Sequence, residues 1–283
     1  MKRVLLLLLI VAWIPARGQE TEEVTLGFSR IEGPNVRKTI AGVGLGVMAV
    51  TTTYDFYNTW WKGAEKPFSF YDEYWFKDGQ LGIDKIGHFF GPYCFTKIVR
   101  NMMLWGGFDK ETAMWWSLAF GIWNGLGIEI GDGFSPWGFD FQDLALDLAG
   151  VSYGLIQSEV PFLQNFNWKF SYWSQKGIAS PANFTSDYDA MTIWLTLNVH
   201  KLLPSSINQY WPEFLQLAVG YGVDEGVSRH EFAIGLDFNL SAFETGNRDI
   251  LIGQRLLEVL HLPAPAVKMV EGKAPNYQMF YLK

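Results

Sequence analysis

The chain has 283 residues, of which 49% are hydrophobic, 17% aromatic and 18% charged. Ordinary soluble domains contain roughly 25% charged residues. Because this chain has fewer charges and ample apolar surface to bury, its composition excludes a disordered protein. The 22 Lys and Arg against 29 Asp and Glu give a formal charge of −7, and no basic patch stands out, so we do not expect a nucleic acid partner. A single Cys excludes a disulfide framework and a zinc site built from several cysteines.

The N-terminus has the parts of a secretory signal peptide. Lys2 and Arg3 form a positive region, residues 4–14 form an apolar core, and residues 16–18 supply small side chains at the two positions that signal peptidase reads. We therefore predict that residues 1–18 are a signal peptide, with an uncleaved N-terminal anchor as the alternative. A signal peptide directs the mature chain to the cell envelope.

Long apolar stretches spotted with glycine fill the chain before residue 165. Their length and the scarcity of turn residues inside them favour helices over strands. Residues 112–128 carry no charge, and their length is at the short limit for a helix that spans a membrane. The predicted helices are Thr39–Tyr54, Phe89–Trp105, Thr112–Ile130 and Leu144–Leu163.

After residue 165 the hydrophobic period becomes two, which indicates strands. The predicted strands cover residues 168–172, 191–197, 215–221 and 231–240, and residues 224–226 form a turn between the last two. A helix over Asp249–His261 follows and is stopped by Pro263 and Pro265.

These elements predict an α+β fold. An N-terminal membrane-associated helical bundle is followed by a small antiparallel β-sheet and a C-terminal helix. The expected divisions are the signal peptide (1–18), a helical domain (19–165) and a strand region with a terminal helix (166–283).

Eight polar residues interrupt the apolar helical half at spacings that place several of them on shared helix faces. Three lie just before the second predicted helix, and two of these, four residues apart, share a face if that segment is helical. Two lie at and just beyond the end of the third, and three lie at intervals of three and four residues before and inside the fourth. They are Asp84, Lys85, His88, Glu129, Asp132, Asp140, Asp143 and Asp147.

The charge balance around these residues is uneven. From residue 112 to residue 168 there are six acids and no Lys, Arg or His. Carboxylates in an apolar setting are neutralised by a proton, a cation or a base from elsewhere. The nearest bases in the sequence are Lys85, His88 and Arg100, and a divalent metal is the other candidate.

Three interpretations of the eight residues stay open. They form a buried salt-bridge network that fixes the register of the helices, or a metal or catalytic centre, or a solvated acidic face. No residue is assigned a catalytic role, and no cofactor is predicted beyond the divalent metal.

The order of three segments, residues 84–89, 129–135 and 139–144, resembles the YfiM-like family of predicted periplasmic or outer-membrane proteins. The resemblance covers about residues 36–160 and implies an envelope protein whose function is unknown. A weaker likeness links the Asp84-Lys85-x-x-His88 start and the later acids to the VanZ-like membrane family.

Together these observations predict an exported bacterial envelope protein at the outer membrane, facing the periplasm. Its expected role is a non-enzymatic structural or accessory component that contacts lipid or a larger outer-membrane protein complex. The alternative is a metal-dependent hydrolase that acts on an envelope lipid or a lipid-linked substrate. In that alternative Asp84, His88, Glu129, Asp132 and Asp143 supply metal ligands and a general base.

Overall fold

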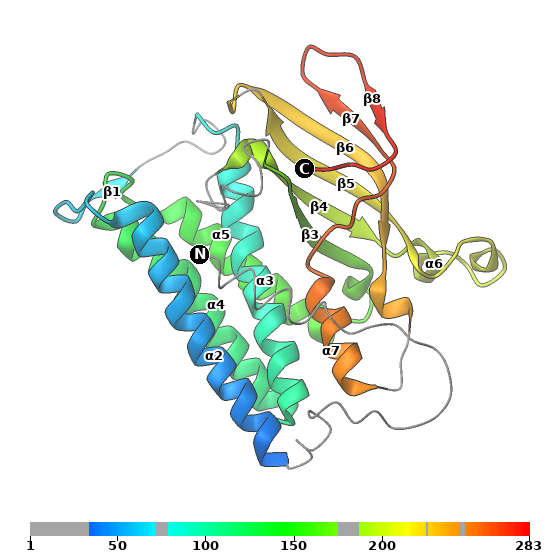
Figure 1. Cartoon of the computed structure of the whole chain (residues 1–283), viewed down its shortest axis with the longest axis horizontal. Coiled ribbons are helices and arrows are strands. Elements are labelled where there is room, and N and C mark those ends of the chain that lie inside the picture. The colour runs from blue at the N-terminus through cyan, green and yellow to red at the C-terminus, as the bar shows by residue number, and fades with distance from the viewer. Residues whose placement is uncertain (1–33, 72–78, 175–186, 225, 244–246) are drawn as a thin grey trace.

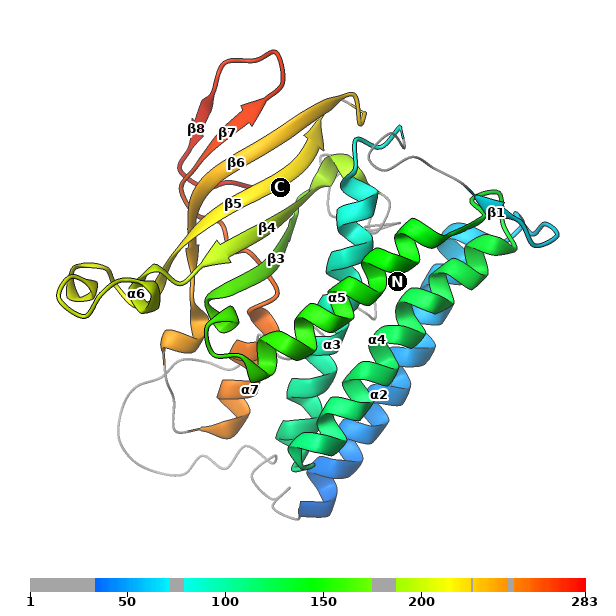
Figure 2. The ribbon, with the colours of Figure 1, turned by 180° about the vertical axis from the view of Figure 1, so that it is seen from behind.

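The computed structural model describes residues 34–71, 79–174, 187–224, 226–243 and 247–283. The predicted signal peptide lies outside these residues. Figure 1 shows a bundle of long helices beside a fanned sheet, and Figure 2 shows the same arrangement from behind. The start of the helix α3 (Ile83–Gly106) joins the two parts, because Ile83 shares a buried apolar cluster with Met191, Ile193 and Val223 of the sheet.

The bundle consists of four long helices, which confirms the helices predicted from the apolar stretches. Aspartates begin two of them: Asp109 accepts the backbone N–H of Thr112, and Asp140 accepts that of Gln142. The predicted helix Leu144–Leu163 was too long at its C-terminal end, since the backbone becomes extended at Val160. Of the helices in the described ranges, none combines the length and the hydropathy needed to cross a membrane. The helices are α2 (Pro34–Phe56), α3 (Ile83–Gly106), α4 (Lys110–Gly133) and α5 (Phe141–Glu159), and a π-helical turn η1 (Tyr57–Trp61) follows α2.

A glycine brings α3 and α5 into backbone contact. A Cβ atom built at Gly150 would lie 2.0 Å from the carbonyl oxygen of Phe89, so no other residue fits there without moving one helix. This close approach sets the acidic start of α5 directly against the start of α3.

The sheet has six antiparallel strands that follow one another in chain order. The predicted hairpin across residues 224–226 is confirmed: Val219 pairs with Ile234, and Val223 pairs with His230. A short parallel pair, β1 (Phe70–Tyr71) with β2 (Phe139–Asp140), lies beside the bundle. The six strands are β3 (Phe166–Tyr172), β4 (Met191–Leu197), β5 (Leu215–Asp224), β6 (Arg229–Phe238), β7 (Ala266–Val270) and β8 (Asn276–Gln278).

The predicted order at the C-terminal end was wrong. The helix α7 (Arg248–Leu257) is shorter than expected and is not terminal, because β7 and β8 follow it and extend the sheet. These strands are short and follow two prolines, so they carry little alternation of their own. β7 pairs with the backbone of β6 over residues 231–235, and β8 pairs with β7, so tertiary contacts make these segments strands. The remaining short elements are 3-10 turns at 163–165, 188–190, 208–210 and 240–242, and α6 (Val199–Leu202).

Both parts of the molecule turn apolar side chains outward. On β5 and β6 the outward residues are Leu217, Val219, Phe232 and Ile234, whereas Glu231 and Asp237 on the same strands are fully buried. The long helices follow the same pattern. Their exposed apolar residues include Val43, Val47, Val50, Trp115, Trp116, Trp123, Phe141, Leu148 and Ile156.

Candidate functional site

The acidic cluster, which we define as the eight polar residues singled out above, gathers where α3, α4 and α5 meet. α3 contributes Asp84, Lys85 and His88, and α4 contributes Glu129 and Asp132. The other three members come from the start of α5 and the residue that caps it: Asp140, Asp143 and Asp147. Hydrogen bonds or ion pairs join seven of the eight to one another. Asp132 is set apart and accepts a hydrogen bond of 2.7 Å from the Trp61 indole.

Lys85 forms one half of the cluster. Its Nζ lies 2.9 Å from Asp140 Oδ2 and 2.9 Å from Asp143 Oδ1, and its side chain is almost completely buried. Burial on its own would lower the pKa of Lys85, but the hydrogen bonds to Asp143 and Asp140 and their charges raise it above the ordinary value. Lys85 is therefore a permanent cation that joins α3 to the start of α5.

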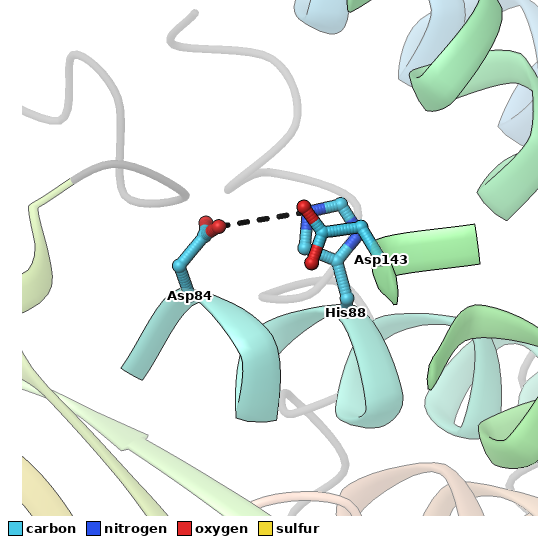
Figure 3. A group of neighbouring side chains, drawn as sticks. All are labelled: Asp84, His88 and Asp143. Atoms are coloured by element: carbon cyan, nitrogen blue, oxygen red, sulfur yellow. Dashed lines mark ion pairs between the residues drawn. The ribbon is translucent and has the colours of Figure 1, made fainter. Parts of the chain in front are cut away.

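His88 forms the other half, with carboxylates on both sides of its ring. Nδ1 lies 3.1 Å from Asp147 Oδ1, and since a carboxylate only accepts, this nitrogen carries the proton of that bond. Nε2 lies 3.7 Å from Asp143 Oδ2 and 3.9 Å from Asp84 Oδ2, which is beyond hydrogen-bond distance. Figure 3 shows Asp84 and Asp143 flanking the His88 ring.

Negative charge dominates the electrostatics around His88. Burial opposes the charged ring, but the charge and the hydrogen bond of Asp147, followed by the charges of Asp84 and Asp143, raise the pKa of His88 well above its ordinary value. Burial also raises the pKa of Glu129 to about 8, against the opposing charge of His88. The pKa values of Asp132 and Asp143 are raised to about 6, again mainly by burial. Six carboxylates thus face two basic side chains, so the cluster attracts further positive charge.

Sequence reasoning missed three neighbours of the cluster. The hydroxyl of Tyr188 donates a hydrogen bond to Asp84, and the indole of Trp61 donates one to Asp132. Gly125 leaves the space that the Asp147 side chain fills, because a Cβ at Gly125 would lie 2.5 Å from Asp147 Cβ. Trp61 and Tyr188 are far from their partners in the sequence, so no local pattern marks them. Gly125 lies one helical turn before Glu129, and this spacing is a weak sequence signal that the glycine borders the cluster.

A second buried group of charges, which we call the sheet network, was also missed. Lys169 Nζ lies 2.6 Å from Asp237 Oδ2 and 3.2 Å from Glu258 Oε2. Glu231 Oε2 lies 2.7 Å from the Nζ atoms of both Lys268 and Lys283. Unlike the acidic cluster, this network has equal numbers of lysines and carboxylates.

Comparison with known proteins finds a similarity over the part of the chain that holds the acidic cluster. Residues 72–159 match the DUF2279 family, which is described as a predicted periplasmic lipoprotein. This span contains α3, α4 and α5, and therefore all eight residues of the cluster. No curated protein and no solved structure matches the chain.

The match agrees with the resemblance to an envelope family over the helical region. It leaves the YfiM-like name unconfirmed, and the weaker likeness to the VanZ-like family finds no support.

Proposed function

We propose that the protein is a cell-envelope component that attaches to a lipid surface through the outer face of its helical bundle. In this proposal the acidic cluster holds the three helices together, and the chain is not an enzyme. The observation that supports it best is a reversed polarity in the bundle, in which the acids Glu129, Asp143 and Asp147 are buried while many apolar side chains are exposed.

The reversal is clearest on α4 and α5. α4 carries no charged residue between Thr112 and Ile128, and its later acid Glu129 is only 1% exposed. On α5 the acids Asp143 and Asp147 are buried, whereas Phe141 is 64% exposed. A helix in contact with water shows the opposite pattern, with its charges on the outside. Extended apolar surface of this kind marks a contact with lipid or with a partner.

The outer stripe of α2 adds to this surface. Val43, Val47, Val50 and Tyr54 are spaced by three or four residues, so they lie along one face, and Val50 is 70% exposed. No charged residue lies between 39 and 54, and Arg37 and Lys38 stand at the N-terminal end of the stripe. Basic side chains beside an apolar face suit a surface of anionic lipid headgroups.

Aromatic side chains favour lipid over a protein partner as the occupant. Trp115, Trp116 and Trp123 are exposed on α4, and Trp137 is exposed just beyond its end. Tryptophan is enriched at membrane–water interfaces, where its apolar ring and its polar N–H are both accommodated. Exposed apolar side chains also occur on all three of α2, α4 and α5.

The proposed location is the outer membrane, on the side that faces the periplasm. The sequence features of a signal peptide and the periplasmic description of the matching family support an envelope location. Separation of inner and outer membranes by density, with detection of the mature chain, tests the finer assignment. The metal-dependent hydrolase is not proposed, because no observation favours hydrolysis.

Vesicle sedimentation tests the lipid contact directly. We expect the purified mature chain to sediment with vesicles of phosphatidylethanolamine and phosphatidylglycerol, and a double variant Val43→Glu/Val50→Glu to lose that binding. A valine that is fully buried contributes about 1.5–3 kcal/mol, so each substitution weakens partitioning roughly tenfold or more.

The matched control is Ile207→Glu/Tyr210→Glu, which changes two exposed apolar residues near α6. This region projects away from the bundle in Figure 1, so the control keeps vesicle binding. Wild-type protein that stays in the supernatant, or a control that loses binding as much as the α2 variant, contradicts the proposal.

A further inference from the structure

We propose that His88 is the centre of a divalent-cation site between α3, α4 and α5, in which His88 Nε2, Asp84 and Asp143 are the protein ligands and Asp147 orients the ring. The site is independent of the lipid contact, because its residues lie inside the bundle rather than on its outer face.

The geometry around Nε2 fits a shared ion better than hydrogen bonds. Its distances of 3.7 Å to Asp143 Oδ2 and 3.9 Å to Asp84 Oδ2 are too long for hydrogen bonds. Two ligand atoms on one zinc ion, each at about 2.0–2.2 Å, lie roughly 3.3–3.6 Å apart in a tetrahedral site. One ligand atom from each of Asp84, His88 and Asp143 lies within 4.8 Å of the other two, so small side-chain rotations close the set.

The other side of the ring is arranged to support a metal ligand. The hydrogen bond of 3.1 Å from Nδ1 to Asp147 fixes the ring orientation and leaves Nε2 free to bind an ion. A histidine that binds a metal almost always donates its second N–H to a carboxylate, a carbonyl or water. Asp147 is 1% exposed, and the small residue Gly125 makes room for it, so its position is well determined.

Carboxylate oxygens without hydrogen bonds show that the cluster as a whole has too little positive charge. Glu129 is almost fully buried, and its Oε1 lies 3.6 Å from His88 Nδ1, on the side of the ring opposite the proposed ligands. Among the described residues, Glu129 Oε1 and Asp147 Oδ2 have no hydrogen-bond partner. Buried oxygens of this kind are costly unless nearby positive charge compensates them. Lys85 does not fill this need, because Asp140 and Asp143 already surround it.

The donor set selects the class of ion. One imidazole nitrogen with two carboxylates suits Zn²⁺ or Mn²⁺, whereas Mg²⁺ and Ca²⁺ prefer oxygen ligands only. We therefore expect tighter binding of Zn²⁺ than of Mg²⁺, with one ion per chain.

Equilibrium dialysis of the chelator-treated mature protein against ZnCl₂, followed by metal analysis, tests the site. Wild-type protein is expected to bind one equivalent, and His88→Gln to lose it. Asp84→Asn also loses it, and because the Asp84 side chain is partly exposed this variant decides the outcome if His88→Gln does not fold. Asp147→Asn weakens binding about 10–100-fold, as expected for a group that orients a ligand.

The control is His200→Gln, which removes a histidine whose ring contacts the Trp211 carbonyl far from the cluster. Its zinc binding stays at one equivalent. Co²⁺ absorption in the visible range supplies a second readout, since it reports nitrogen and oxygen ligands directly and is lost in Asp84→Asn.

Three results overturn the site. The first is wild-type protein that binds less than half an equivalent of Zn²⁺. The second is one equivalent retained by His88→Gln, which means adventitious binding elsewhere. The third is loss of zinc in Glu129→Gln with full retention in Asp84→Asn, which moves the ion to the opposite ring nitrogen.

Discussion

The helical bundle and the sheet both bury charges, but only the sheet balances them. In the sheet network three lysines, Lys169, Lys268 and Lys283, meet three carboxylates at 2.6–3.2 Å. In the acidic cluster, within the described part of the chain, six carboxylates share two basic side chains, Lys85 and His88. In a balanced network each buried charge has an opposite charge as its partner, whereas a network with excess carboxylates holds protons or binds a cation. The difference indicates a structural role for the charges buried in the sheet, and it supports the cation site proposed in the bundle.

The largest expected effect comes from removing the central cation of each region. Lys85→Met leaves Asp140 and Asp143 without their lysine, and Lys169→Met does the same to Asp237 and Glu258. Breaking a buried pair in this way costs about 3–5 kcal/mol, a large share of the roughly 5–15 kcal/mol that stabilises a domain. Urea unfolding followed by circular dichroism measures both losses. Adding Asp143→Asn to Lys85→Met should restore part of the stability; no restoration would show that the pair does not act through its charges.

Removing one carboxylate is expected to lower the stability of the sheet but not that of the bundle. Asp237→Asn leaves Lys169 with less compensation in a fully buried site, so we expect a loss of about 1–3 kcal/mol. Glu129→Gln in chelator removes one of several crowded acids, and its amide oxygen can still accept the Asp140 N–H, so stability is unchanged or higher. Thermal unfolding with and without chelator measures both. A strongly destabilised Glu129→Gln would contradict the unbalanced charge of the cluster.

The metal-free bundle is expected to lose stability as the pH rises. Glu129, with a pKa raised to about 8, keeps its proton in the folded state, whereas the unfolded chain releases it above about 4.5. The folded state therefore binds more protons between these values, and stability falls across that window. The raised pKa of His88 acts in the same direction, because its contribution is complete below about 6.5 and is lost above its folded pKa. We expect a loss of about 1–3 kcal/mol between pH 5.5 and 8.5.

Hydrogen exchange of α4 and α5 in chelator, corrected for its intrinsic pH dependence, measures this loss. Saturating Zn²⁺ should reduce the pH dependence, because the cation takes the place of the protons. Stability that rises with pH in the chelated protein would be inconsistent with the burial of these acids.

The sheet is expected to show the opposite pH dependence. His261 stacks on Trp194 with ring centroids 3.9 Å apart, and burial lowers its pKa to about 4. Between about 4 and 6.5 the unfolded chain binds a proton that the folded sheet does not, so stability rises with pH in this window. Exchange of β4 to β6 at pH 5 and 7 tests it, and His261→Gln should remove the dependence.

The last prediction needs no substitution. Hydrogen exchange of the wild-type protein tests whether the two strands of the hairpin open as one unit. Residues 215–223 and 230–238 pair along their whole length, so their amides should be protected together. Opening of one strand without the other would argue against the sheet as a cooperative region.

The sequence by itself determined the local elements and the identity of the polar residues. Long apolar stretches with few turn residues predicted the four long helices, because a buried or lipid-facing helix needs no polar face. Strict alternation over 215–221 and 231–240 predicted the hairpin, since a strand turns alternate side chains to opposite faces. The excess of acids over bases from residue 112 to residue 168 indicated that a proton, a cation or a base from elsewhere compensates their charge.

Only the tertiary structure decided how these pieces combine. Lys85 and His88 lie three residues apart on α3. Helix packing nevertheless pairs Lys85 with Asp140 and Asp143, whereas His88 lies among four carboxylates. β7 becomes a strand by pairing with β6, and β8 by pairing with β7. Lys169 contacts Asp237 and Glu258, which are distant from it in the sequence. Such contacts depend on which helix faces and strand edges meet in space, and neither hydrophobic period nor residue spacing carries that information.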